Sequence, residues 1–191
     1  MFTPDDHRHM AYALELAARG LYTTTPNPRV GCVIVKDGKV VGEGWHEKAG
    51  AAHAEPIALE HARKQAAGAT VYVTLEPCAH HGRTPPCVDA LLKAKPARVV
   101  AAMQDPNPRT AGKGFEQLRA AGITVDVGLM ETEARELNIG FVSRMTRGTP
   151  WVRMKVAASL DGRTALADGQ SQWITGAEAR RDGHAWRARA C

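Results

Sequence analysis

The spacing of hydrophobic and polar positions predicts a helix and then a β-hairpin at the start of the chain. Over residues 5–20, apolar side chains recur at helical spacing, and Gly20 is a plausible end for the helix. Two valine-rich runs follow, at 30–35 and 40–45, and the sequence Lys-Asp-Gly-Lys joins them. An Asp-Gly pair between two such runs is typical of a tight hairpin turn.

After the hairpin, the pattern alternates between helices and strands. The expected helices lie at 54–67, 87–94, 115–121 and 131–144, and the expected strands lie at 70–75, 98–103 and 123–127. Two strands followed by alternating helices and strands favour an α/β sandwich with a mixed sheet of about five strands. A Gly-Lys-Gly run at 112–114 matches neither a phosphate-binding loop nor a dinucleotide fingerprint, and we interpret it as a turn before a helix.

The pattern is interrupted at residues 146–150, a Thr-Arg-Gly-Thr-Pro stretch that is a candidate linker. Beyond it, we expect a strand at 151–158 and a helix at 177–190. One strand and one helix cannot bury a core by themselves, so this region is expected to be the opening of a second, truncated domain. We therefore divide the chain into domains at 1–146 and 147–191.

Composition and charge narrow the classes of function. The 191 residues are 44% hydrophobic and 5% aromatic, with a net charge of +5 and no long basic block. Few aromatic residues and scattered basic ones argue against a nucleic-acid partner. No apolar run is long enough to cross a membrane, and the polar N-terminus does not resemble a secretory signal. We expect a cytoplasmic protein whose four cysteines are thiols or metal ligands.

The strongest chemical signal joins a His-Ala-Glu motif, in which His53 leads, to two cysteines. Cys78 and Cys87 are separated by eight residues, and Cys87 follows two prolines. One histidine and two cysteines supply the three protein ligands of a catalytic zinc ion, with a fourth position open for water. Proline in the first turn, as at Pro56, is typical of a helix start, where the helix dipole favours thiolates.

Glu55 is expected to transfer protons rather than to bind the metal. It would take a proton from a zinc-activated water and pass it to the leaving amine, a general acid/base role. Two other interpretations stay open from the residues alone. One is a structural zinc site with a fourth ligand, for which His80 and His81 are candidates. The other is a chance arrangement that binds no metal.

The motifs together resemble one enzyme family. The run from Thr74 to Cys87, TLEPCAHHGRTPPC, with the His-Ala-Glu motif, resembles the deaminase half of the bifunctional riboflavin-biosynthesis deaminase–reductases. Deaminases of nucleic acids and free nucleosides typically have two residues between the cysteines instead of eight. Further matches lie at 25–28 (TPNP), 31–35 (GCVIV) and 105–108 (DPNP), and the resemblance covers residues 5–190.

The resemblance implies a cytidine-deaminase-like three-layer α/β/α sandwich and a zinc hydrolase of cyclic amidines. The implied reaction is hydrolytic deamination of 2,5-diamino-6-ribosylamino-4(3H)-pyrimidinone 5′-phosphate to 5-amino-6-(5-phosphoribosylamino)uracil and ammonia, in riboflavin biosynthesis. Asn27 and the backbone at Ala54 would hold the substrate beside the zinc. His46, His80 and Arg83 would meet the ribose phosphate. From the residues alone, a simple turn residue at Asn27 and a surface residue at His46 are alternatives with less weight than the substrate contacts.

The last part of the chain resembles the opening of the family's reductase domain, which is similar to dihydrofolate reductase in fold. The resemblance rests on the runs KVAASLDGR at 155–163 and SQWIT at 171–175. It implies contacts from Ala157 and Trp173 to NADPH, and from Ser171 and Arg187 to the substrate. NADPH is expected only where a complete reductase domain is present. An exposed partial domain also suggests a homo-oligomer.

Three rival functions follow from the same residues. A deaminase of cytidine, guanine or a tRNA base would use the same metal group, although the eight-residue spacing and few aromatics count against it. A catalytically silent, zinc-stabilised binding or assembly module would be favoured by a fold that is stable without metal and shows no turnover. A complete dual enzyme would bind NADPH as well as the phosphoribosyl pyrimidinone.

Overall fold

The computed structural model describes residues 1–82, 84–108 and 110–189. The chain forms two compact units, Met1–Pro150 and Trp151–Cys191, and each is described here by itself. None of the helices in the described ranges combines the length and apolar character needed to cross a bilayer.

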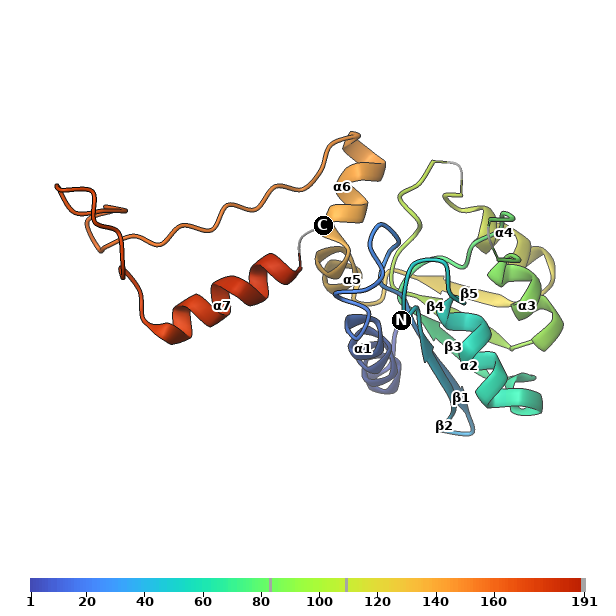
Figure 1. The fold of residues 1–191 in the computed structure, drawn as a ribbon. Helices are drawn as coiled ribbons and strands as arrows, with labels where there is room; N and C mark the ends of the chain where they lie inside the picture. The colour runs from blue at the N-terminus through green and yellow to red at the C-terminus, as the bar shows by residue number, and fades with distance from the viewer. Residues whose placement is uncertain (83, 109, 190–191) are drawn as a thin grey trace. The chain divides into compact units, whose positions relative to one another are not determined.

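The first unit is built on one five-stranded sheet (Figure 1). In chain order its strands are β1 (Gly31–Lys36), β2 (Lys39–Trp45), β3 (Thr70–Val73), β4 (Arg98–Ala101) and β5 (Thr124–Val127). Their order across the sheet is β2-β1-β3-β4-β5. β1 is antiparallel to β2 and β3, whereas β3, β4 and β5 are parallel. The predicted hairpin and the predicted mixed sheet are both confirmed.

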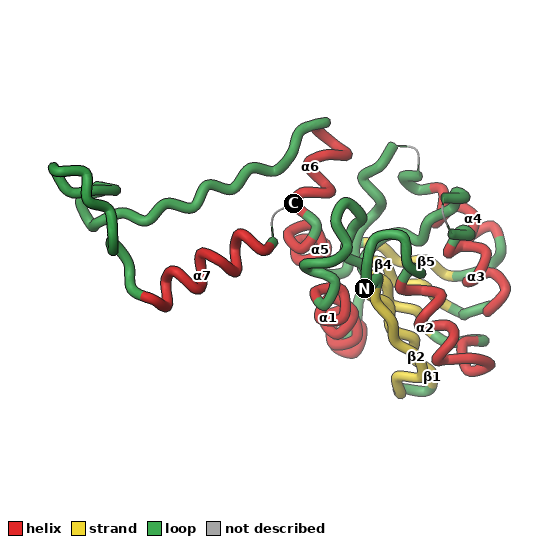
Figure 2. The backbone as a smooth tube through the Cα atoms, in the orientation of Figure 1, coloured by secondary structure: helices red, strands yellow, loops and turns green. Residues whose placement is uncertain are grey.

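Helices cover both faces of this sheet (Figure 2). They are α1 (Pro4–Ala18), α2 (Ala54–Ala62) with a 3-10 turn at Arg63–Ala66, α3 (Cys87–Ala94), α4 (Lys113–Ala120), α5 (Glu131–Leu137) and α6 (Ile139–Arg147). α2, α3 and α4 lie on one face, and α1 and α5 lie on the other. The expected three-layer α/β/α sandwich is therefore confirmed.

Two hydrophobic clusters, one on each face, hold the layers together. Successive side chains of a strand point to opposite faces, and β1 shows this directly. Cys32 and Ile34 join the cluster under α2, α3 and α4, while Val33 and Val35 join the cluster under α1 and α5. Cys32 is fully buried, so it packs as a small apolar residue.

A glycine in β2, Gly44, lets the first turn of α2 approach the sheet closely. A Cβ atom on Gly44 would lie 2.6 Å from the carbonyl oxygen of Ala54 and 2.8 Å from the backbone nitrogen of Ala58. Real Cβ atoms do not come so near to backbone atoms, so the first turn of α2 can pack against β2 only where the strand has no side chain. This contact places His53 and Glu55 at the end of the sheet.

The single helix predicted over 131–144 is wrong, because the chain leaves the helix at Asn138. The buried side chain of Asn138 donates to the backbone carbonyl of Arg29 at 2.9 Å and accepts from the backbone N–H of Arg29 at 2.8 Å. This pair of side-chain bonds attaches the junction of α5 and α6 to Arg29, while the backbone N–H of Asn138 still donates to the carbonyl of Ala134 at 3.2 Å. It also fixes the loop that contains Asn27.

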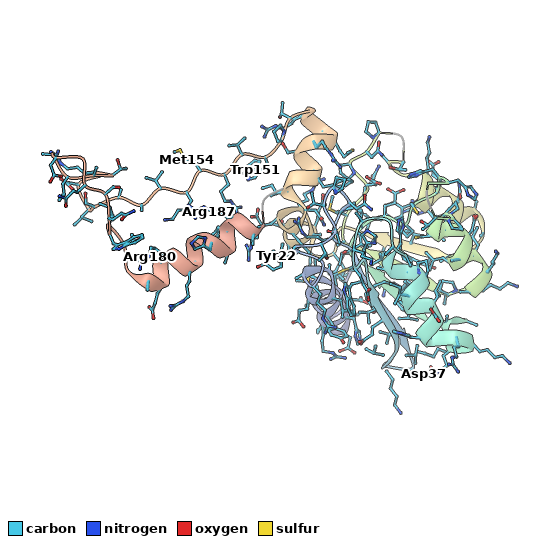
Figure 3. All side chains as sticks on the ribbon, viewed as in Figure 1. Tyr22, Asp37, Trp151, Met154, Arg180 and Arg187 are labelled. Atoms are coloured by element: carbon cyan, nitrogen blue, oxygen red, sulfur yellow. The ribbon has the colours of Figure 1, made fainter. Side chains whose placement is uncertain are left out.

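The second unit differs from its expected structure. The strand predicted at 151–158 is wrong, since residues 151–189 contain no strand. Val152 and Met154 are 80% and 84% exposed on an extended segment (Figure 3). A strand needs neighbouring strands to pair its backbone groups, and residues 151–189 form no other strand. The predicted helix is confirmed as α7 (Ala177–Ala188), and Arg153 stacks on its Trp186 at 4.2 Å.

Candidate active site

Three potential metal ligands come together from separate elements of the first unit. His53 is the residue just before α2, Cys78 lies in the loop after β3, and Cys87 is the first residue of α3. The Nδ1 atom of His53 lies 3.2 Å from the Cys87 Sγ and 3.6 Å from the Cys78 Sγ. All three ligand atoms lie within 4.8 Å of one another. The three residues predicted from spacing thus form one group.

The two thiols form a tightly coupled pair. Hydrogen bonding from the Cys87 thiol, from His53 and from the backbone N–H of Cys87, 3.3 Å away, outweighs burial and lowers the pKa of Cys78 to about 4. The same contact with Cys78, together with burial, raises the pKa of Cys87. A divalent metal displaces the protons that such a pair shares. The pair is therefore arranged as a ready source of thiolate.

Glu55 lies against this group from the first turn of α2. Its side chain is buried, and burial first, with the negative charge of Cys78 second, raises its pKa to about 7. A carboxyl group with a pKa near neutrality can both accept and return a proton. Its contact with the Cys87 thiol places the carboxyl group beside the potential metal ligands, which suits the expected proton transfer.

A pocket of about 520 Å³ opens onto the group. Six of the residues singled out from the sequence line it: Asn27, His46, His53, Glu55, Cys78 and His80. Ala54 is buried beside them at the start of α2. Arg83 lies outside the described residues. The volume suits a small ligand rather than a polymer.

His46 is engaged by the protein on both ring nitrogens. Its Nδ1 donates to the carbonyl oxygen of Ala52 at 2.9 Å, and its Nε2 lies 3.1 Å from the Asn27 Nδ2. Burial lowers the pKa of His46, so the neutral ring accepts the hydrogen bond from the Asn27 amide. The ring also meets that of His53 edge-on at 5.5 Å. His46 therefore orients Asn27 in the pocket wall.

Sequence reasoning gave no role to other polar residues that line the pocket. Glu76, Asp105 and Asn107 all belong to its wall. They lie in motifs that the family resemblance included, TLEPC and DPNP, and those motifs were the available signal. The Glu76 carboxylate accepts from backbone N–H groups of residues 29 to 38 positions away, a relationship that no local pattern reveals.

The four residues expected to serve the reductase lie in the second unit. Ser171 and Trp173 are exposed, and Ala157 is half-buried. The guanidinium of Arg180 stacks on Trp173 at 4.2 Å. Arg187 is exposed on α7, with its Nη1 3.4 Å from the His184 Nδ1 (Figure 3). Their roles stay predictions.

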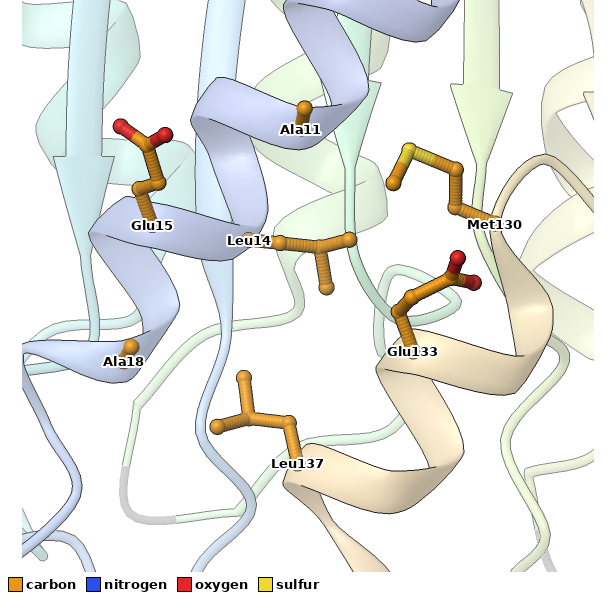
Figure 4. A pocket seen from close by; sticks show the side chains of 7 residues that line it. All are labelled: Ala11, Leu14, Glu15, Ala18, Met130, Glu133 and Leu137. Atoms are coloured by element: carbon orange, nitrogen blue, oxygen red, sulfur yellow. The ribbon is translucent and has the colours of Figure 1, made fainter.

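A second, shallower pocket of about 360 Å³ lies between α1 and α5 (Figure 4). Apolar side chains such as Leu14, Met130 and Leu137 line it together with Glu15 and Glu133. None of His53, Cys78 and Cys87 lines this pocket. The first two of these potential metal ligands line the larger pocket instead.

Comparison with known proteins decides the family. The cytidine and deoxycytidylate deaminase zinc-binding region matches residues 3–103, more than half of the 191 residues. The chain belongs to this zinc-binding deaminase family. A second family model, the RibD C-terminal domain, matches residues 150–191.

Relatives confirm the resemblance to the riboflavin-biosynthesis family. The chain is 61% identical to the riboflavin biosynthesis protein RibD of Escherichia coli over 97% of its residues and 50% of that protein. The structure of Acinetobacter baumannii RibD matches with a TM-score of 0.93 and 59% identity, covering 97% of this chain and 52% of that one. A deaminase/reductase from Thermotoga maritima matches with a TM-score of 0.90 and 44% identity, over 96% and 53%. The chain thus spans about half the length of these relatives.

The residues present fit the metal that the family name implies. Zinc prefers imidazole nitrogen and thiolate sulfur, and catalytic sites use three protein ligands. One nitrogen and two sulfurs within 4.8 Å match that donor set. Glu55 lies beside these ligands, with its pKa raised to about 7 by burial and by the charge of Cys78.

Proposed function

We propose that this chain is a zinc-dependent hydrolase that deaminates 2,5-diamino-6-ribosylamino-4(3H)-pyrimidinone 5′-phosphate to 5-amino-6-(5-phosphoribosylamino)uracil and ammonia. The observation that carries the proposal is the His-Cys-Cys group with buried Glu55 at a pocket of small-molecule size. The substrate is inferred from similarity to RibD proteins, which are named for riboflavin biosynthesis.

His53, Cys78 and Cys87 would hold the zinc. When bound, the ion supplies Lewis-acid activation of a water molecule. Glu55 accepts a proton from the nucleophilic water as the new C–O bond forms at the amine-bearing ring carbon. It then delivers that proton to the departing nitrogen as the C–N bond breaks, so that ammonia leaves and Glu55 is restored.

Substrate recognition is assigned to residues around the pocket. Asn27, oriented by His46, and the backbone at Ala54 would hold the pyrimidinone ring. His80, which is exposed at the pocket edge, and Arg83 would meet the phosphate, because cationic and N–H donors suit phosphate oxygens. His46 lines the pocket beside Asn27 and is likewise proposed to meet the ribose phosphate.

We further propose a cytoplasmic homo-oligomer with no nucleic-acid partner. Several apolar side chains of the second unit are well exposed, including Val152, Met154 and Leu160, and such surface is typical of an interface. Residues 1–146 are proposed as the deaminase domain and 147–191 as a linker and reductase fragment. NADPH contacts by Ala157 and Trp173 belong to a complete reductase domain.

Ammonia release by the zinc-loaded protein tests this function. The phosphoribosyl diaminopyrimidinone and cytidine are assayed in parallel, since the matched family is described by cytidine and deoxycytidylate deamination. We expect turnover of the first substrate only. Turnover of cytidine alone would establish the rival nucleoside deaminase, and zinc binding without turnover of either would favour an assembly module.

A further inference from the structure

Glu76 is a buried carboxylate near the metal group that the mechanism above does not use. It follows β3, two residues before Cys78, and is 4% exposed. Its carboxylate accepts three backbone N–H hydrogen bonds. The donors are Asp105 at 3.1 Å and Gly112 at 2.9 Å, both to Oε2, and Gly114 at 2.9 Å to Oε1. One side chain therefore joins both ends of the segment from Asp105 to Gly114.

The backbone around Glu76 makes this junction tight. The N–H of Glu76 donates to the carbonyl of Met103 at 3.0 Å, just beyond β4. A Cβ atom on Gly114 would lie 2.2 Å from the carbonyl oxygen of Pro77 and 3.2 Å from the Glu76 Oε1. Only a residue without a side chain lets the start of α4 lie so close. The close packing of α4 therefore explains why the last position of the Gly-Lys-Gly run at 112–114 is a glycine.

The segment held by Glu76 forms part of the pocket wall. Asp105 and Asn107 both line the pocket. The Asp105 carboxylate accepts from the backbone N–H of Asn107 at 2.8 Å and from the Thr110 hydroxyl at 2.8 Å. The loop is therefore shaped by Asp105 and attached by Glu76.

We propose that Glu76 is a positioning residue that fixes this wall relative to the metal group. The proposal rests on the proposed function, because it concerns binding of the same substrate. Glu76 sits on the same short stretch as Cys78, so its three hydrogen bonds set the distance between wall and metal group. A carboxylate offers acceptors only, which matches three N–H donors. A glutamine would turn an NH₂ group toward one of them.

Glu76→Gln tests the proposal, with Glu116→Gln as the matched control. Glu116 is exposed on α4, so its change leaves intact the clamp, that is, the three backbone hydrogen bonds to the Glu76 carboxylate. We expect Glu76→Gln to keep its zinc and its circular dichroism spectrum. Hydrogen exchange should accelerate roughly tenfold or more at the amide of Gly112 or of Gly114, whichever faces the new NH₂ group and so loses its acceptor. KM should rise by a similar factor with kcat nearly unchanged, because the wall binds groups that do not react.

Gly114→Ala supplies a second variant that alters no carboxylate, with Gly140→Ala as its control. A Cβ on Gly140, in α6, meets no atom within 4 Å. Gly114→Ala should reproduce the faster exchange and the higher KM, whereas Gly140→Ala should change neither.

Two outcomes would overturn the proposal. Unchanged amide exchange in Glu76→Gln would show that the carboxylate does not hold the segment. Faster exchange with an unchanged KM would show that the segment does not position the substrate. If the wild-type chain releases no ammonia, the proposed function fails, while the exchange comparison between Glu76→Gln and Glu116→Gln still decides whether the clamp exists.

Discussion

The first 150 residues and the segment after them carry similar local patterns that lead to different structures. In β1, Val33 is fully buried between neighbouring strands, and its run was expected to be a strand. The run at 151–158 was also expected to be a strand, yet its Val152 is 80% exposed and unpaired in any ladder. The comparison teaches that β-branched and apolar residues favour extension, whereas neighbouring strands are needed to make a sheet.

The same contrast holds for the chemistry. In the first unit, His53, Cys78 and Cys87 arrive from three places in the chain and meet within 4.8 Å. In the second unit, Trp173 is 69% exposed and its described ring contact is with nearby Arg180. Packing of the first unit therefore brings distant residues together at one site, whereas Trp173 in the second unit contacts a residue close to it in the chain.

The largest expected effect is on catalysis by the first unit. Glu55→Gln should lower kcat for ammonia release by about 10² to 10⁴, because general acid/base catalysis is worth that much. Zinc content, measured on the same samples, should stay unchanged. Trp173→Ala, in the second unit, is the control and should retain deamination. A comparable loss in both variants would contradict the separation of roles.

A core substitution should next show how the first unit is held together. Leu118 on α4 is fully buried in the cluster under α2, α3 and α4. Leu118→Ala should lower the free energy of unfolding by about 3 kcal/mol, through lost burial and a cavity. Urea denaturation followed by circular dichroism measures this. A loss of about 0.5 kcal/mol or less would mean that the cluster is not well packed.

A buried ion pair should have a smaller effect that depends on pH. Burial would raise the pKa of Asp6, but hydrogen bonds from Arg98, from the Thr3 backbone and from Tyr72 hold it well below its ordinary value of 3.8. Its stabilisation is therefore present above pH 3.8 and is lost as the pH falls further.

Asp6→Asn should thus destabilise the chain by about 2 kcal/mol at neutral pH. The difference from the wild type should shrink below pH 3.8. Unfolding curves between neutral and acidic pH measure it, and Asp5→Asn, an exposed neighbour, is the control. A difference that grows as the pH falls would have the wrong sign for this explanation.

The smallest effect is expected in the second unit. Met154 is 84% exposed in the single chain, so at concentrations where the protein is monomeric Met154→Ser should change the free energy of unfolding by no more than about 0.5 kcal/mol. The denaturation experiment used for Leu118→Ala gives the direct comparison. A loss near that of the core variant would show that Met154 is buried in solution, and it would weaken the contrast drawn between the two units.

Much of the first unit could be predicted from the sequence, because its signals are local. The hairpin, the mixed sheet and the metal group followed from spacing, from Asp37-Gly38 and from prolines at helix starts. The attachment of Asn138 to Arg29 could not be predicted, since the two residues lie far apart in the chain. The contacts of Glu76 were hidden for the same reason, because its partners are backbone amides of a later loop.

The most direct test of the account is a zinc titration of the whole chain, stripped of metal, with ammonia release from the phosphoribosyl diaminopyrimidinone measured at each addition. The account predicts that the rate rises in proportion to bound zinc and stops rising at one zinc ion per chain, as the single His53-Cys78-Cys87 group in the described residues requires. One bound zinc per folded chain without ammonia release would contradict it.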